Sequence, residues 1–272
     1  MSPADTQPNV SVGAAVSPPT PQATEQVLAL TRRLRLPYLR NAATDVLATA
    51  RSQRWDPAEV LRVLLTEEIT GRDAATIRAR RKKANFPAGK TFEVFDEARC
   101  SIPAATQQAL RTLEWVDRHE NLCVCGPSGT GKSHLCEALG QAAVDTGRAV
   151  AWFAIDDLGA LVRRHRADDS VAKAIRRIIR ADLIVVDDIG MLPVSDDAAE
   201  GFYRLVDTCY EIRSLAVSSN LHPSGFDELM PKTLATATVD RLLHHAHVCV
   251  TEGDSYRLAQ ATTGKGVTPM PT

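Results

Sequence analysis

Residues 126–133 read GPSGTGKS and directly follow the apolar run LCVC. The spacing GxxxxGK[ST] is that of a phosphate-binding loop between a strand and a helix, in which backbone N–H groups surround polyphosphate oxygens. The glycines permit close approach, Lys132 reaches the β- and γ-phosphates, and the Ser133 hydroxyl serves Mg²⁺. The sequence therefore predicts a nucleoside triphosphate site. Its predicted contacts are Gly126, Pro127, Ser128, Gly129, Thr130, Gly131, Lys132, Ser133 and His134.

A second stretch, ADLIVVDDIG at residues 181–190, places two acids after a short apolar run. Residues 183–186 have the composition of a parallel strand that is covered on both faces. Because Mg²⁺ prefers oxygen ligands, Asp187 is predicted to bind the metal together with Ser133. Asp188 is the candidate for polarising the attacking water. A strand that merely ends in an acidic turn is the alternative, and the preceding phosphate loop favours the catalytic interpretation.

Apolar runs and helical patterns alternate beyond the phosphate loop, as they do in a mainly parallel sheet with helices on both faces. The expected strands are residues 122–125, 149–154, 183–187, 215–219 and 247–251. The expected helices lie near 132–146, 156–180, 196–212 and 232–245. The predicted fold is therefore α/β, with a five-stranded parallel sheet that binds its ligand at the carboxyl ends of the strands. The roughly twenty residues after the last strand are too few for a further helical lid domain.

The N-terminal part of the chain differs from this core. Residues 1–23 are rich in Pro, Ala, Ser and Thr and have almost no large apolar residues, so we expect a disordered tail. Residues 24–88 carry helical patterns, interrupted at Pro37 and starting again with Asp56 as N-cap and Pro57 at the first helical position. The predicted domains are thus a tail (1–23), a helical domain (24–88), a nucleotide-binding domain (89–258) and a flexible tail (259–272).

The net charge of −1 hides an asymmetry. Residues 25–90 contain 14 Lys and Arg against 7 Asp and Glu, whereas residues 91–272 contain 18 against 25. The basic end is the candidate for binding nucleic acid through phosphate contacts, and a solvated helix end is its alternative. The first candidate track is Arg78, Arg80, Arg81, Lys82 and Lys83. The second is Arg163, Arg164, Arg166, Arg176, Arg177 and Arg180.

Composition limits the other classes of protein. No apolar run approaches the roughly 20 residues that span a bilayer, and the first residues show no signal-peptide pattern, so we expect a cytoplasmic protein without a membrane partner. Six cysteines show no CxxC spacing and mostly lie in apolar runs, which indicates buried thiols. The histidines of HHAH, residues 244–247, have no second ligand cluster, which favours a surface or interface group over a metal site.

Four motifs of this chain resemble those of the IstB-like ATPases, the transposition helpers of insertion sequences, which are close relatives of the DnaC helicase loaders. They are GPSGTGKSHL, LIVVDDIG, VSSNLHPSGFDE (217–228) and ATVDRLLHHAHVCVTEGDSYRL (237–258). The resemblance covers about residues 25–258 and includes the order and spacing of all four. Both groups are AAA+ ATPases without the usual C-terminal lid, so the resemblance implies ATP and Mg²⁺ as cofactors.

The resemblance also implies roles for three polar residues. Asn220 matches the sensor that orients water or reports on the γ-phosphate. Arg241 matches the arginine finger offered to a neighbouring subunit's ATP, and Arg257 matches the second arginine, which senses the γ-phosphate. The simpler alternatives are a strand-end turn for Asn220 and a surface charge for Arg257. For Arg241 the alternative is an ion pair with Asp240, which is weak because adjacent helical positions do not face each other.

Three further residues resemble the FxxFD element that approaches adenine, namely Phe92, Phe95 and Asp96. The chain departs from the common AAA+ pattern at Asp188, where many members have Glu. The shorter acid implies slow hydrolysis, which would suit a timer or switch.

The function implied is an ATP-dependent helper that forms homo-oligomers on double-stranded DNA and assists a cognate transposase. A DnaC-like loader of a replicative helicase is the alternative within the same fold. A small-molecule kinase is the alternative from another class, and its ATP turnover would not respond to DNA.

Overall fold

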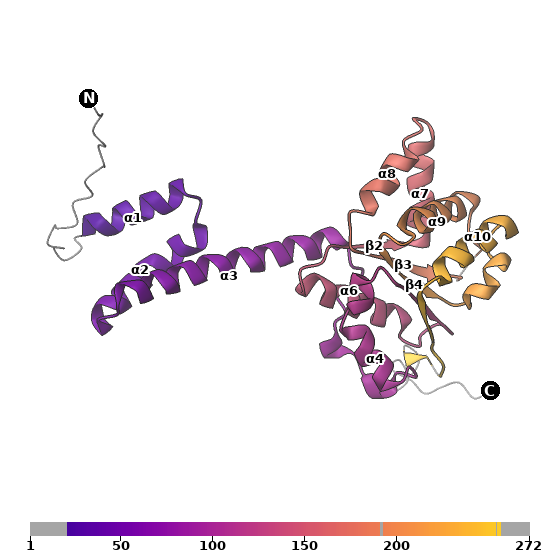
Figure 1. The fold of residues 1–272 in the computed structure, drawn as a ribbon, viewed down its shortest axis with the longest axis horizontal. Helices are drawn as coiled ribbons and strands as arrows, with labels where there is room; N and C mark the ends of the chain where they lie inside the picture. Colours follow the sequence, from indigo (N-terminus) through magenta and orange to yellow (C-terminus); the bar gives the residue numbers. More distant parts are fainter. Residues whose placement is uncertain (1–20, 191–192, 254, 257–272) are drawn as a thin grey trace, which may run out of the picture. The chain divides into compact units, whose positions relative to one another are not determined.

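The computed structural model describes residues 21–190, 193–253, 255 and 256. Two compact units divide between Thr76 and Ile77, within the long helix α3 (Figure 1). The sequence pattern placed a domain boundary at residue 88, beyond the end of this helix. The predicted tails 1–23 and 259–272 lie outside the described residues, except for residues 21–23 at the start of α1.

The first unit is built from α1 (Pro21–Arg33), α2 (Pro37–Gln53) and the first part of α3 (Pro57–Ala84). Proline begins α2 and α3, where its fixed φ suits the first turn and its missing N–H leaves no bond unmade. The Asp56 carboxylate accepts a hydrogen bond from the Ala58 N–H at 2.8 Å, which supports the predicted start of α3. The buried core of this unit is Leu39, Ala43 and Leu64.

The start of α2 is capped by an acid from another helix. Glu68 on α3 is buried, and its Oε2 accepts from the N–H groups of Tyr38 and Leu39, both at 2.9 Å. Its Oε1 accepts from Arg72 at 2.6 Å. Burial acts to raise the pKa of Glu68, but these N–H groups and Arg72 together bring the pKa below its ordinary value. The carboxylate therefore stabilises the α2–α3 packing in its charged form.

We expect Glu68→Ala to destabilise α2 by about 1–3 kcal/mol, because it removes the acceptor of the buried Leu39 N–H and of the half-buried Tyr38 N–H. Amide exchange in α2 should accelerate by roughly 5- to 150-fold, which mass spectrometry of the full chain can measure. The control is the exposed neighbour, in a Glu67→Ala variant. Because the folded pKa is lowered, protection should be complete above the unfolded pKa of about 4.3 and lost as pH falls through the folded pKa. Equal exchange in both variants would contradict the capping role.

The second unit contains a five-stranded parallel sheet in the order β2-β3-β4-β1-β5. This confirms the predicted α/β fold. The strands are β1 (Asn121–Cys125), β2 (Val150–Ala154), β3 (Leu183–Ile189), β4 (Ser214–Ser219) and β5 (Ala246–Val250).

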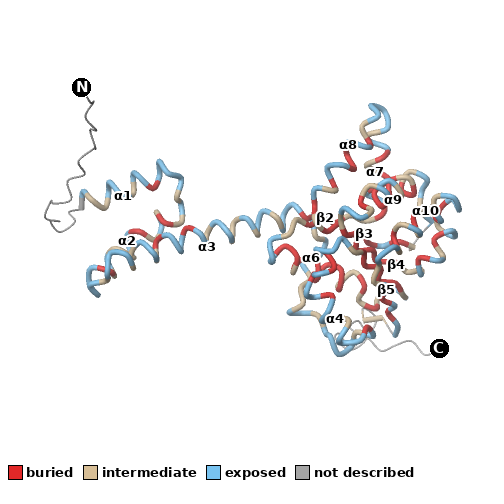
Figure 2. Tube along the Cα trace, in the orientation of Figure 1, coloured by how far each residue is buried: buried red, intermediate tan, exposed pale blue. Residues whose placement is uncertain are grey.

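Both faces of the sheet are covered by helices, so β1 and β4 are buried throughout and β3 is buried except at Asp188 (Figure 2). Along β3, Ile184 and Val186 belong to one apolar cluster, whereas Leu183 and Val185 belong to the other. One cluster contains α7 (Ile155–Arg166), α8 (Val171–Ile178), α9 (Asp196–Cys209), η3 (Pro223–Glu228) and α10 (Lys232–Leu243). The other contains α4 (Ala104–Arg111), α5 (Glu114–Asp117) and α6 (Lys132–Asp145).

The single helix predicted near 156–180 is wrong, because α7 and α8 are separate helices. The break lies at the sequence ADDS, where Asp169 has φ +52°. The Asp168 carboxylate accepts from the Ser170 hydroxyl at 2.6 Å and from its N–H at 3.2 Å. Such local bonds compete with the helical backbone pattern, and the apolar periodicity on either side does not reveal them.

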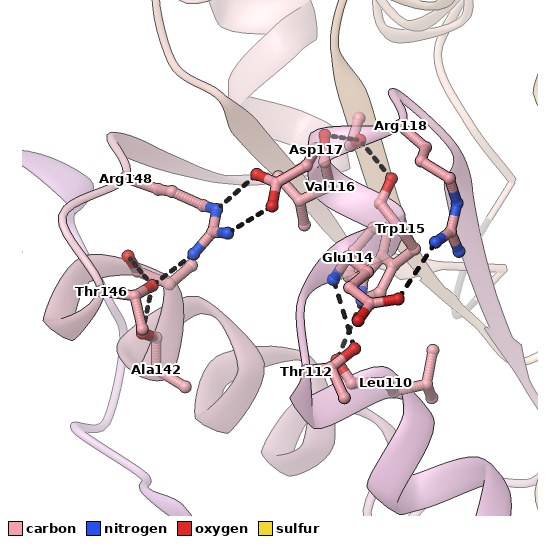
Figure 3. A network of polar contacts seen from close by, with 12 residues as sticks. Leu110, Thr112, Glu114, Trp115, Val116, Asp117, Arg118, Ala142, Thr146 and Arg148 are labelled. Carbon is pink, nitrogen blue, oxygen red and sulfur yellow. Dashed lines mark hydrogen bonds and ion pairs between the residues drawn. The ribbon is translucent and has the colours of Figure 1, made fainter.

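A polar network joins α5 to the turn between α6 and β2 (Figure 3). The Arg148 guanidinium donates to both Asp117 oxygens, at 3.0 and 2.7 Å, and to the Thr146 hydroxyl at 2.6 Å. The buried Trp115 Nε1 donates to the Leu110 carbonyl at 3.0 Å across the α4–α5 bend. These bonds hold the helices that lead the chain into β1.

No helix in the described part of the chain is both long enough and apolar enough to cross a membrane.

Candidate functional site

The loop between β1 and α6 has the backbone conformation that its glycines were predicted to allow. Gly126, Gly129 and Gly131 have φ values of +143°, +86° and +92°. A Cβ at Gly126 would also collide with the carbonyl of Thr251. Helix α6 begins at Lys132, so its N-terminal N–H groups and its positive dipole end point into the loop, an arrangement that binds anions.

Lys132 connects the loop to the end of β4. Its Nζ donates to the Pro127 carbonyl and to Asn220 Oδ1, both at 2.8 Å. The side chain is 7% exposed, and burial lowers the pKa of Lys132 despite the opposing effects of Asp187 and Asp188. The backbone N–H of Asn220 donates to the Ile189 carbonyl at 2.8 Å, and this bond helps to position Asn220. The ammonium and the amide predicted to face the γ-phosphate thus lie side by side.

Ser133 and Asp187 form a second pair beside the first. The Ser133 hydroxyl donates to Asp187 Oδ1 at 2.8 Å, and the Ser218 hydroxyl of β4 donates to the same oxygen. Asp187 is 6% exposed. A buried carboxylate facing a hydroxyl at the phosphate loop offers the hard oxygen atoms that Mg²⁺ prefers, so these residues fit the metal site predicted for them.

The backbone of Asp188 departs from the regular conformation of strand β3. It has φ +63°, in the left-handed region, at a register shift between Val186 and Ile189 of β3. Its N–H donates to the Ser218 hydroxyl at 3.3 Å, and its side chain is exposed at the edge of the site. Aspartate tolerates this conformation better than most residues, and bulges of this kind often aim a side chain at an active site.

A cavity of about 450 Å³ extends from the phosphate loop to the segment before α4. Its size suits a nucleotide. The lining residues are Lys90, Val94, Phe95, Asp96, Arg99, Cys100, Ser128, Gly129, Thr130, Gly131, Lys132, Ser133, His134, Asp188, Asn220 and Tyr256. The cavity therefore brings together most of the nucleotide-site residues that the sequence predicted.

The FxxFD element comprises the 3₁₀ helix η1 (Phe92–Val94) and the two residues that follow it. Phe95 lines the cavity and packs edge-on against His134, with ring centroids 5.1 Å apart. Phe92 is not among the lining residues and supports Phe95 from behind, at 5.8 Å. The Asp96 carboxylate accepts from the Arg99 N–H and caps η2 (Glu97–Arg99).

Arg241 lies away from this cavity. Its Nε pairs with Asp207 Oδ1 of α9 at 3.0 Å, and its side chain is 33% exposed. Because α10 leads directly into the start of β5, Arg241 is near the amino end of the sheet, whereas the phosphate loop is at the carboxyl ends. Arg241 thus pairs with Asp207 rather than with Asp240. Arg257 lies outside the described residues.

The structure brings the two basic tracks together at one point. Lys83 and Arg164 line a second cavity, of about 350 Å³, beside the edge strand β2. Three other members are paired with acids: Arg81 with Asp145 at 2.5 Å, Arg166 with Asp197 and Glu200, both at 2.7 Å, and Arg163 with Asp197 at 3.6 Å. The remaining members of the two basic tracks are Arg78, Arg80, Lys82, Arg176, Arg177 and Arg180.

The histidines of residues 244–247 lie outside the nucleotide cavity, as do all the cysteines except Cys100. His244 and His245 are exposed. Among the described residues, they form with Glu211 a group of possible metal ligands whose ligand atoms all lie within 4.8 Å of one another. Five of the six cysteines are buried and Cys100 is half-buried, as the sequence predicted. Burial raises the pKa of Cys125 to about 11 and that of Cys209 to about 12, so these thiols stay neutral near pH 7.

Six residues at the site were missed from the sequence. Ser218 bonds Asp187, while Lys90, Val94, Arg99, Cys100 and Tyr256 line the cavity. The tyrosine stands next to the predicted sensor arginine in SYRL, which is the one signal that could have drawn attention to it.

Comparison with known proteins identifies relatives along most of the chain. The model of the family described as IstB-like ATP binding protein matches residues 29–264. A predicted ATP-binding protein of insertion sequence IS21 from Pseudomonas aeruginosa is 33% identical over 233 residues, which are 85% of this chain and 88% of that one. A predicted ATP-binding protein of insertion sequence IS232 from Bacillus thuringiensis subsp. berliner is 31% identical over 83% of this chain and 91% of its own.

Solved structures share the fold at lower identity. The replication initiator DnaA bound to AMPPCP and single-stranded DNA matches with a TM-score of 0.50 at 21% identity. The match covers 62% of this chain and 52% of that one, so this chain spans about half of the DnaA chain. The crystal structure of DnaI matches with a TM-score of 0.50 at 14% identity, over 63% of this chain and 94% of that one. These likenesses place the second unit in the AAA+ P-loop fold.

Proposed function

This chain belongs to the family of IstB-like ATP-binding proteins, and we propose that it hydrolyses ATP with Mg²⁺ as the DNA-bound helper of an insertion-sequence transposase. The observation that carries the proposal is the pairing of Lys132 with Asn220 and of Ser133 with Asp187 at one end of a nucleotide-sized cavity. A cation, an amide, a hydroxyl and a carboxylate meet there at the ends of β1, β3 and β4. This set of groups suits phosphoryl transfer to water.

The proposed roles follow from these contacts. Lys132 leaves Pro127 and Asn220 to bond the β- and γ-phosphates, while the α6 N-terminus binds the oxygens between them. Ser133 and Asp187 hold Mg²⁺, which when bound would neutralise phosphate charge. Asp188, at the open edge of the site, accepts a hydrogen bond from the attacking water. Asn220 orients that water.

ATP turnover with and without Mg²⁺ and double-stranded DNA tests this function. We expect turnover that needs Mg²⁺ and rises when DNA is added, because DNA gathers subunits into a proposed oligomer. A turnover indifferent to DNA would favour a kinase-like enzyme. The partner is tested separately, by comparing ATP-dependent binding of the cognate transposase with binding of a replicative helicase. Binding of the helicase alone would favour the loader function.

The proposed DNA surface is the basic end of α3 with the arginines of α7 and α8. Lys83 and Arg164 lie at one cavity, so a single phosphate backbone could contact both tracks there. Contacts to phosphate carry no base information, so the binding should have little sequence preference. The pairing of Arg81 with Asp145 makes Arg81 the least suited member of its track.

Neutralising Arg80, Lys82 and Lys83 to Gln should reduce the slope of log affinity against log salt by up to about 3, since each lost phosphate contact removes about 0.9. Fluorescence anisotropy with a labelled duplex at several salt concentrations measures the slope. A matched triple variant, Arg62→Gln, Arg118→Gln and Arg204→Gln, changes the net charge equally at arginines paired with acids. If both triple variants give the same slope, the basic run is a solvated helix end.

A further inference from the structure

The chain returns to the phosphate loop after its last strand. The Thr251 N–H donates to the Cys125 carbonyl at 2.7 Å, and its hydroxyl bonds that of Thr130 at 2.7 Å in a buried contact. Further along, the Tyr256 N–H donates to the Gly129 carbonyl at 3.0 Å. A Cβ at Gly129 would collide with Ser255. Thr251 and Tyr256 thus hold the loop through contacts to Cys125, Thr130 and Gly129.

This return places the Tyr256 ring in the wall of the cavity. Its hydroxyl donates to the Arg99 carbonyl, and the Arg99 guanidinium carbon lies 4.7 Å from the ring centroid. Cation and ring therefore form a stacked pair. Both residues line the cavity, as do Phe95 and Asp96.

The position of the Arg99–Tyr256 pair in the cavity determines which part of a bound nucleotide it contacts. The phosphates of a nucleotide would accept hydrogen bonds from the N–H groups of residues 128–133. A Cβ built at Gly131 would lie 3.8 Å from a carbon of the Tyr256 ring. The remaining length of the cavity, toward Phe95 and Arg99, is where the base must lie. The Tyr256 ring offers stacking to a flat heterocycle and carries no charge that would attract a phosphate.

We propose that the stacked pair of Arg99 and Tyr256 recognises the base of the bound nucleotide, so that part of the nucleotide affinity comes from the aromatic ring of Tyr256. The inference rests on the proposed ATP site. It adds to that site a specificity element contributed by the segment after β5, and it links occupancy by a base to the position of the phosphate loop through the bond from Tyr256 to Gly129.

Binding of ATP and of inorganic tripolyphosphate, measured by calorimetry on the full chain, separates the base from the phosphates. Tyr256→Leu should weaken ATP by roughly 5- to 150-fold, the range measured for base–aromatic stacking, and leave tripolyphosphate within about twofold. Tyr256→Phe keeps the ring and should bind ATP within about threefold of the parent. Tyr210→Leu, at a half-buried tyrosine outside the cavity, should change neither affinity.

The controls make the outcomes distinct. Unchanged ATP affinity in Tyr256→Leu would overturn the inference. An equal loss for ATP and tripolyphosphate would also overturn it, since this would show that Tyr256 only supports the loop. If Tyr256→Phe loses as much ATP affinity as Tyr256→Leu, the hydroxyl bond to Arg99 matters and the stack does not. A parent chain that binds neither ligand would instead refute the proposed nucleotide site itself.

Discussion

Lys132→Ala should weaken ATP binding by at least 100-fold, about 3 kcal/mol, and abolish measurable turnover. Lys132 supplies a cationic side chain to the proposed phosphate site, and a charge-assisted bond to phosphate inside a partly buried site is stronger than one in water. Calorimetry gives the affinity, and a coupled assay gives the turnover.

The same variant should fold normally. Burial lowers the pKa of Lys132, so the charged side chain is held in the loop against a desolvation cost that Ala does not have. The melting temperature without ligand should therefore change little, while the increase caused by saturating ATP should disappear. Lys232→Ala, at an exposed position on α10, is the control and should keep both affinity and thermal shift. Parental ATP affinity in Lys132→Ala would refute the assignment of the phosphate loop.

The sequence allowed the sheet and the polar end of the site to be predicted because both depend on local patterns. Apolar runs mark the strands, and GxxxxGKS with the two acids near the end of β3 marks the carboxyl ends where parallel strands meet. The family resemblance added Asn220, and the structure places it beside Lys132. These residues lie close together because each follows a strand of the same parallel sheet.

Other features depend on tertiary packing and could not be predicted in the same way. The left-handed turn at Asp188 arises from a register shift between β3 and β4, which no single strand shows. The contact of Tyr256 with Arg99 joins residues far apart in the chain. The pairing of Arg241 with Asp207 needs α9 and α10 to lie together. A family resemblance can identify a functional residue, but the contacts of that residue depend on the tertiary packing.

The pairing with Asp207 bears on the proposed arginine finger. Arg241 is near the amino end of its own sheet and cannot reach its own phosphate loop at the opposite end. To act it must contact the ATP of a neighbouring subunit and exchange Asp207 for a phosphate. The exposed pair with Asp207 is worth only about 0–1 kcal/mol, so this exchange costs little.

Arg241→Ala should therefore bind ATP normally and lose roughly 10³- to 10⁵-fold in turnover, the range for arginine fingers in related chemistry. Loss of a surface pair leaves folding nearly unchanged, which circular dichroism can check. Arg204→Ala, which removes a similar exposed pair with Glu200 on α9, is the matched control and should retain turnover. Parental turnover in Arg241→Ala would show that Arg241 is not the finger.

A mixture of two inactive variants tests whether Arg241 acts in trans. Asp188→Asn keeps its own finger but loses the acid that polarises water, and Asn tolerates the left-handed backbone at this position as Asp does. In an equal mixture with Arg241→Ala, about one interface in four joins an intact pocket to an intact finger, so turnover should recover to about a quarter of the parental value. Recovery should require ATP and DNA and rise with protein concentration. If fluorescence energy transfer shows that subunits exchange but turnover stays absent, Arg241 does not act on a neighbouring subunit's ATP.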